Sequence, residues 1–196
     1  MITWSFRAGI AGFALTVLAG CEDGQGGGLL DGLATAAAPP NVALSQADLA
    51  FGAVTLVPPR GFCIDKRSLR QRFALMARCD KLGAPSAAAG APIGIITASV
   101  SAAGTSGLPS PEQTALAFQL ESTSAVRTTD SSVIFRATGG VPSTELSTTH
   151  WRGSARMGSQ VVGLALYGPE DGRAVSSEGR AILRELIDRS TDAAGG

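Results

Sequence analysis

His150 is the only histidine of the chain, and it lies in a segment that could assemble a reactive group. Residues 147–149, a serine and two threonines, precede it, and Trp151 and Arg152 follow it. A serine nucleophile needs a base beside it, yet the chain has no Gly-x-Ser-x-Gly elbow, Ser-x-x-Lys motif or paired-acid pattern. Three interpretations stay open: His150 is a packed or solvated strand residue, it belongs with Trp151 and Arg152 to a binding patch, or it is a catalytic base.

Basic residues are concentrated in one segment, although the whole chain has a formal net charge of zero. Residues 60–81 carry seven basic side chains against two acidic ones, a local balance of +5. Such a segment could face anionic lipid headgroups or an acidic partner, or it could be a solvated loop with its charges on several sides. We include Arg60, Arg67 and Arg70 in the possible binding patch with residues 150–152. The remaining basic residues of the segment are Lys66, Arg72, Arg78 and Lys81.

The first 21 residues resemble the start of a bacterial lipoprotein precursor. Arg7 is followed by twelve uncharged, mostly apolar residues, 8–19, which are too few for a membrane-spanning helix but suit a signal peptide. The run ends in Leu-Ala-Gly-Cys at residues 18–21, which resembles the lipobox of that class. The resemblance implies that residues 1–20 are removed, that Cys21 carries a diacylglycerol, and that its new amino group is acylated, for example by palmitate. The alternative is an ordinary secretory signal that leaves a free thiol.

We expect residues 21–41 to form a lipidated N-terminus and a flexible linker. The segment is rich in glycine and alanine and ends near two prolines. Its glycines lack the spacing and the preceding strand of a phosphate-binding loop. Glu22 and Asp23 are acidic, and acidic residues after a lipidated cysteine resemble the signals that retain some lipoproteins in the inner membrane. We therefore expect a lipid anchor on the periplasmic side of the inner membrane rather than the outer membrane.

Two further cysteines, Cys63 and Cys79, lie 16 positions apart. If the chain is exported, this even pair predicts a disulfide bond. The alternative is two separately buried thiols. A zinc site is less consistent with the sequence, because zinc takes four ligands and the chain offers this pair and one histidine. We expect no metal and no other cofactor.

Composition excludes several classes of function. Hydrophobic residues make up 44% of the 196 residues and charged residues 16%, and the zero net charge gives no excess to neutralise nucleic-acid phosphates. We therefore expect no nucleic-acid partner. Residues 42–192, long enough to bury a core, are expected to form a single domain.

Short apolar or β-branched runs bounded by glycine, proline or polar residues predict strands. Ser110-Pro111-Glu112-Gln113 has the pattern of a helix start with a capping box, and a last helix is expected from Ser176 or Ser177 to about Arg189. The glycine in Met157-Gly158-Ser159 predicts a β-hairpin. The predicted strands are Phe51–Val57, Phe73–Ala77, Ile93–Ser101, Val133–Thr138, Leu146–Arg156 and Gln160–Tyr167.

These elements predict an α+β fold, an antiparallel sheet of five to six strands with an inserted helix and a C-terminal helix packed on it. Strand alternation places Trp151, Gly153 and Ala155 on one face, and His150, Arg152, Ser154 and Arg156 on a polar face. A strand that ends at Pro59-Arg60-Gly61-Phe62, followed by strands, helix, hairpin and helix, is similar in order to Mog1/PsbP-like domains. That resemblance implies binding or assembly rather than catalysis.

The sequence thus favours a membrane-tethered envelope lipoprotein that binds or assembles an envelope component. The second hypothesis is a lipoprotein that binds a small ligand on the sheet face near His150, Trp151 and Arg152, and the third is an envelope hydrolase. The expected partner is an unknown envelope protein or an anionic ligand. No motif supports the third, so an enzyme is the less expected outcome. A deep pocket would favour the second reading, and a cluster of serine, histidine and an acid would favour the third.

Overall fold

The computed structural model describes residues 42–88, 90–104 and 107–194. The expected signal peptide, the lipidated Cys21 and the linker therefore lie outside the described residues.

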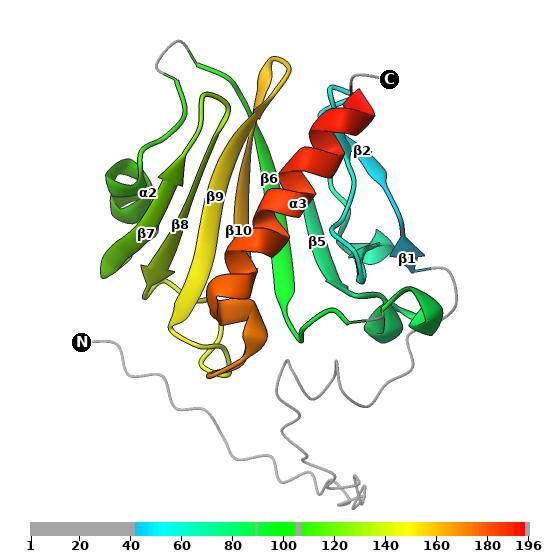
Figure 1. The fold of residues 1–196 in the computed structure, drawn as a ribbon. Coiled ribbons are helices and arrows are strands. Elements are labelled where there is room, and N and C mark those ends of the chain that lie inside the picture. Colours follow the sequence, from blue (N-terminus) through cyan, green and yellow to red (C-terminus); the bar gives the residue numbers. More distant parts are fainter. Residues whose placement is uncertain (1–41, 89, 105–106, 195–196) are drawn as a thin grey trace, which may run out of the picture.

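An antiparallel sheet of eight strands organises the described chain (Figure 1). This confirms the predicted α+β class with a large antiparallel sheet, but the expected number of five to six strands was wrong. In spatial order the strands are β1 (Ala43–Leu44), β4 (Phe62–Asp65), β5 (Phe73–Arg78), β6 (Ile95–Ala102), β10 (Gln160–Tyr167), β9 (Thr149–Met157), β8 (Ser132–Thr138) and β7 (Ser122–Thr128). A separate two-stranded sheet pairs β2 (Ala47–Leu49) with β3 (Val54–Leu56).

The strands that the sequence did not predict are short or polar. β1 has two residues and β4 has four, whereas β7 is mostly polar and almost wholly exposed at the edge of the sheet. Pairing with a neighbour, rather than a hydrophobic pattern, defines such strands. Phe51, expected inside a strand, lies instead in the turn between β2 and β3.

Both predicted helices are present. α2 (Pro111–Phe118) begins with the predicted capping box, in which Ser110 Oγ accepts from the amide of Gln113 and the Gln113 side chain accepts from the amide of Ser110. α3 (Ser177–Ala194) extends past the predicted end at Arg189. Short 3-10 helices occupy the connections: η1 (Lys66–Ser68), η2 (Cys79–Leu82), η3 (Pro85–Ala87) and η4 (Arg173–Val175). None of the helices in the described chain is long and apolar enough to cross a bilayer.

α3 covers one face of the sheet and forms the main core with it (Figure 1). Its predicted apolar stripe, Ile182, Leu183, Leu186 and Ile187, is buried. Trp151 on β9 reaches the start of the helix, where its indole nitrogen donates to the carbonyl oxygen of Ser176 at 2.6 Å. A side chain at Gly179 would collide with this indole, so the glycine allows the helix to approach the sheet.

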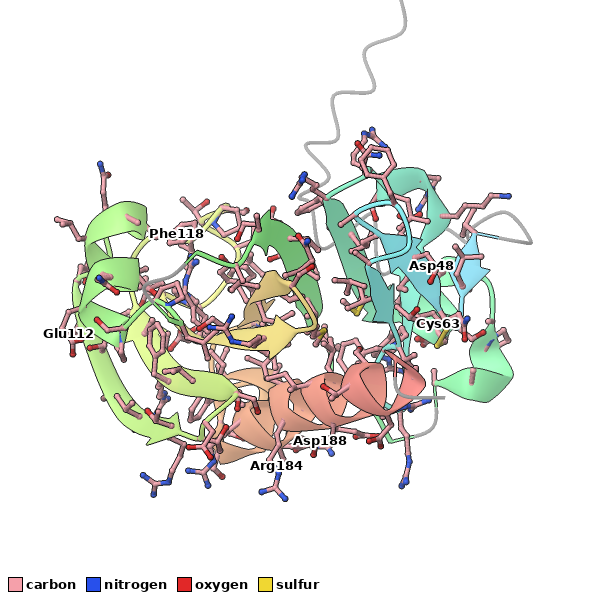
Figure 2. All side chains as sticks on the ribbon, turned by 90° about the horizontal axis from the view of Figure 1, so that it is seen from above. Asp48, Cys63, Glu112, Phe118, Arg184 and Asp188 are labelled. Atoms are coloured by element: carbon pink, nitrogen blue, oxygen red, sulfur yellow. A yellow bond between two sulfur atoms is a disulfide. The ribbon has the colours of Figure 1, made fainter. Side chains whose placement is uncertain are left out.

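The opposite face of the sheet is covered over only part of its width. Val133, Phe135 and Ala137 of β8 form a separate small core there with Leu108 and Leu120, which flank α2. Seen from above, α3 lies on one side of the sheet and Phe118 at the end of α2 lies toward the other (Figure 2). The part of this face formed by β6 and β10 carries the exposed Ser99 and Ser101 and is open.

Candidate functional site: a trough on the open face of the sheet

A trough with a volume of about 430 Å³ lies on the open face, and we call it the sheet trough. Its floor consists of small side chains on β6, β9 and β10, and its ends are marked by two aromatic rings, Phe73 and Phe118. Val141 and Pro142, in the connection after β8, line the wall next to Phe118. The floor residues include Thr97, Ser99, Ser154, Gly163 and Ala165.

The strand register fixes how the sheet trough runs. Arg152 on β9 is opposite Ala165 on β10, and Phe73 on β5 is opposite Ser99 on β6. The sheet trough therefore crosses four neighbouring strands. Gly163 lies between the two ends of the sheet trough and keeps its floor low, because a Cβ on this residue would lie 3.1 Å from Ser99 Oγ.

Arg152 forms the charged wall of the sheet trough, although only 6% of its surface is exposed. Its Nε donates to His150 Nε2 at 3.0 Å, and its Nη2 donates to the hydroxyl of Tyr167 at 3.1 Å. The ring of Phe118 lies over the guanidinium carbon at 4.1 Å, a cation–π contact. The third nitrogen, Nη1, has no hydrogen-bond partner within the described part of the chain.

No carboxylate neutralises Arg152 among the described residues. All the ion pairs there involve other arginines, such as Arg173 with Glu178 and Arg78 with Asp80. Burial lowers the pKa of Arg152, and its contact with Tyr167 opposes that shift. A guanidinium remains charged in proteins, and a buried charge is costly unless it is paired. Arg152 is thus a buried positive charge with a free donor beside an open cavity, which is the arrangement that binds a carboxylate or phosphate.

His150 supports Arg152 rather than a nucleophile. Its Nδ1 lies 3.2 Å from the carbonyl oxygen of Thr148, which can only accept, so the proton is on Nδ1 and Nε2 accepts from Arg152. Its ring stacks on Tyr167 with 4.8 Å between the ring centroids. Burial lowers the pKa of His150 to about 4. The hydrogen bond to Thr148 opposes this shift, whereas the charge of Arg152 adds to it. Both ring nitrogens are occupied and the lowered pKa makes the ring a weak base, so it is unsuited to act as a general base.

The six residues of the sequence-predicted binding patch lie in four different places. His150 and Arg152 meet at the sheet trough, whereas Trp151 points to the opposite face, under α3. Arg60 lies beside α3, where Glu185 accepts from its amide at 3.2 Å. The remaining two, Arg67 and Arg70, lie in the connection between β4 and β5.

Tyr167 and Phe118 complete the site and were not predicted from the sequence. A signal for Tyr167 was available, because counting back from the turn of the β9–β10 hairpin places His150 opposite this only tyrosine of the chain. Phe118 gave no such signal. It is 53% exposed at the end of a short helix, and its position over Arg152 depends on how α2 packs on β8.

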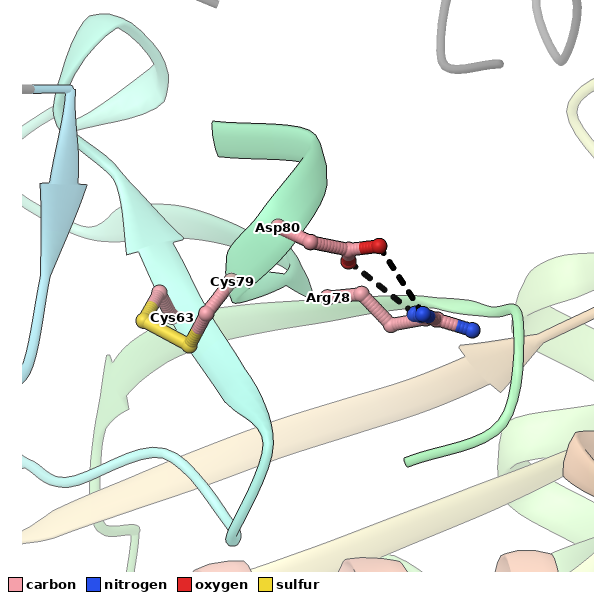
Figure 3. The surroundings of a disulfide bond; sticks show 4 residues. All are labelled: Cys63, Arg78, Cys79 and Asp80. Atoms are coloured by element: carbon pink, nitrogen blue, oxygen red, sulfur yellow. Dashed lines mark hydrogen bonds and ion pairs between the residues drawn. A yellow bond between two sulfur atoms is a disulfide. The ribbon is translucent and has the colours of Figure 1, made fainter. Parts of the chain in front are cut away.

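Cys63 and Cys79 are joined by a disulfide (Figure 3). The bond links β4 to the first residue of η2, and both cysteines are buried with Val42, Ala77 and Leu82. Arg78 and Asp80 form an ion pair next to it, with 2.8 Å between Nη2 and Oδ2. Within the described residues, no group of three or more potential metal ligands is found.

Comparison with known proteins gives no family for this chain. No protein-family model matches it, and no curated protein is significantly similar to it.

Proposed function

We propose that the protein is a lipid-anchored binding module of the bacterial cell envelope, and that its sheet trough holds the anionic group of a small ligand. One observation carries this proposal: Arg152 is buried beside the sheet trough with a free Nη1 and with no carboxylate to neutralise it among the described residues. A carboxylate or phosphate at this nitrogen would supply the missing counter-charge. The lipid anchor rests on the lipobox at residues 18–21.

The lining favours a ligand that is mainly apolar apart from its anionic end. Phe118 is next to the guanidinium, and Phe73 closes the far end of the sheet trough over small side chains. Sites for small molecules typically combine such an apolar lining with a few polar groups that fix the orientation. A medium-chain carboxylate has this form, with its carboxylate at Arg152 and its chain directed to Phe73.

The surroundings of His150 favour binding over hydrolysis. A serine hydrolase needs a histidine that accepts the proton of a hydroxyl, but Nε2 of His150 accepts from Arg152. The geometry thus supports the second of the three sequence-based readings. A larger partner would bind through the same anion site only by presenting a carboxylate to Arg152.

Calorimetric titration with decanoate tests the proposal, with decyltrimethylammonium as the cationic control. Both are used below their micelle concentrations. We expect wild type to bind decanoate and not the ammonium compound, and Arg152→Met to bind neither. Arg156→Met is the matched control, since Arg156 is on the same strand but does not line the sheet trough.

Arg152→Met leaves the buried Nε2 of His150 without its donor, which is expected to cost about 1–3 kcal/mol. The variant should therefore unfold cooperatively at a somewhat lower temperature than wild type, and titration well below that temperature separates lost binding from lost folding. Decanoate binding that survives in Arg152→Met, or that disappears equally in Arg156→Met, contradicts the proposal.

A further inference from the structure

An exposed aromatic residue lies on a strained turn between β2 and β3. Phe51 is 86% exposed, the most exposed large hydrophobic residue among those the structure describes. Ala50, Phe51 and Gly52 have φ values of 50°, 60° and 85°. Two consecutive non-glycine residues in the left-handed region are unfavourable, and residues strained in this way cluster at functional sites. The turn therefore exposes an aromatic ring to water and does so in an unfavourable backbone conformation.

Basic residues lie next to this turn. The amide of Ala50 donates to the carbonyl oxygen of Gln71 at 2.7 Å, which fastens the turn to the connection between β4 and β5. Residues 65–72 contain four basic side chains and one acidic side chain, a balance of +3. The four basic side chains are Lys66, Arg67, Arg70 and Arg72, and all are exposed.

Most of this charge is not neutralised by the described residues. Asp65 pairs with Arg67 at 2.9 Å, and the hydrogen bonds of Arg70 and Arg72 go to backbone carbonyl oxygens. The other acidic side chain near the turn, Asp48, accepts from Thr55. An exposed aromatic ring beside unpaired cations fits the interface of an anionic bilayer, where rings enter the boundary between headgroups and acyl chains.

The chain also enters the described domain at this end. The amide of Lys66 donates to the carbonyl oxygen of Val42 at 2.8 Å, and Ala43 is opposite Asp65 in the sheet. Val42 follows Cys21 by 21 residues. A lipid on Cys21 would therefore be tethered to the end of the domain that carries Phe51 and the basic residues.

We propose that Phe51 together with Lys66, Arg70 and Arg72 forms a docking surface for an anionic lipid bilayer. Phe51 enters the headgroup region, and the three cations contact lipid phosphates. This docking surface is separate from the sheet trough and does not depend on the ligand proposed for it. A lipid anchor on Cys21 would raise the local concentration of the domain at the bilayer, but the docking surface should bind without it.

Vesicle co-sedimentation tests this proposal with the processed chain from residue 21 carrying Cys21→Ser, so that no acyl chain contributes. We expect binding to vesicles of phosphatidylcholine with phosphatidylglycerol and little binding to phosphatidylcholine alone. Arg70→Ser/Arg72→Ser should weaken binding by about thirty-fold, because each basic residue contributes about fivefold near an anionic surface. Phe51→Ser should weaken it as well, and added salt should reduce the wild-type binding.

Arg127→Ser/Arg180→Ser is the control, because it removes the same charge from exposed or partly exposed positions remote in sequence. Equal losses in this control and in Arg70→Ser/Arg72→Ser would show non-specific attraction and overturn the proposal. Equal binding to both vesicle types would also overturn it.

Two outcomes identify another occupant instead. If Phe51→Ser changes the oligomeric state measured by light scattering and leaves vesicle binding intact, the surface joins two copies of the chain. If Arg152→Met abolishes vesicle binding, lipid enters the sheet trough rather than the docking surface. The ligand titration and the vesicle assay can thus fail independently.

Discussion

Arg152 is held by groups that give it hydrogen bonds without neutralising its charge. His150 accepts from Nε while neutral, and the Tyr167 hydroxyl accepts from Nη2. A neutral acceptor leaves the positive charge of Arg152 without a counter-charge, whereas a carboxylate in the same place would neutralise it within the protein. Burial also raises the pKa of Tyr167 against the opposing effect of Arg152, so its hydroxyl stays protonated at pH 7. The side chains around Arg152 thus leave its positive charge available to the anionic group proposed for the sheet trough.

The neutral state of His150 makes stability dependent on pH. Its pKa is about 4 in the folded protein, against about 6.5 when exposed to water. The unfolded chain therefore binds a proton between these values that the folded protein does not. This contribution is fully present above pH 6.5 and is lost as the pH falls toward 4.

Urea unfolding at pH 7 and pH 5 measures the effect. We expect wild type to lose about 2 kcal/mol of unfolding free energy between these values, and His150→Gln, which cannot titrate, to lose much less. The carboxyl groups whose pKa values are lowered, Asp65, Asp80 and Glu112, remain ionised over this range. An identical loss in both proteins would mean that His150 is not buried in its neutral form.

At the scale of elements, the β9–β10 hairpin serves both faces of the sheet. Trp151 points to α3 while His150 and Arg152 point to the opposite face of the sheet, as strand alternation predicted, and Arg152 lines the sheet trough there. Sequence reasoning identified this hairpin, both helices and the apolar stripe of α3, because each has a local signal in turn, capping or periodic residues.

The covering of the polar face could not be predicted in the same way. It depends on α2, which buries only Pro111 and whose Leu116 and Phe118 are exposed, so its sequence has no clear apolar side. Its position follows from packing next to β7 and β8, which is long-range information. This is why Arg152 was expected on a polar surface and is found buried.

The disulfide is the element-scale feature with the largest expected effect on stability. It closes the loop from β4 through β5 to η2, over a separation of 16 residues. In the chain-entropy model a loop of this length contributes about 3 kcal/mol. We expect Cys63→Ala/Cys79→Ala to lose about 2–4 kcal/mol in urea unfolding.

Alkylation without reductant is the companion measurement. Neither Cys63 nor Cys79 of the native protein should react, and both should react after reduction and unfolding. Treating wild type with reductant should reproduce the stability of the double variant. Full alkylation of either cysteine without reductant would contradict the disulfide in the native protein.

At the scale of the whole molecule, the two proposed sites are adjacent in the chain. Arg72, at the edge of the docking surface, directly precedes Phe73, which closes the far end of the sheet trough. A ligand lying from Arg152 to Phe73 would therefore have its apolar end directed toward the docked bilayer. This arrangement favours an amphiphilic anion that reaches the protein from the membrane over a freely soluble polar one.

Attachment to the membrane is the prediction that underlies this arrangement. The resemblance of residues 18–21 to a lipobox predicts that cells growing with a clickable palmitate analogue label the wild-type protein and not Cys21→Ser. The variant should also keep its signal peptide, because the lipoprotein peptidase requires the lipidated cysteine. A wild-type protein that takes up no label contradicts the anchor, while the sheet trough and docking surface remain testable in solution.

The acidic pair after Cys21 leads to a second prediction, which concerns the membrane in which the protein is anchored. If Glu22 and Asp23 retain the protein, sucrose-gradient fractions should place it with the inner membrane, and Glu22→Ser/Asp23→Ser should shift it toward the outer membrane. Recovery of wild type with outer-membrane porins would contradict retention, and the double substitution should then change nothing. Retention would keep the docking surface facing the periplasmic leaflet of the inner membrane, whose anionic phospholipids are the partner that its charges require.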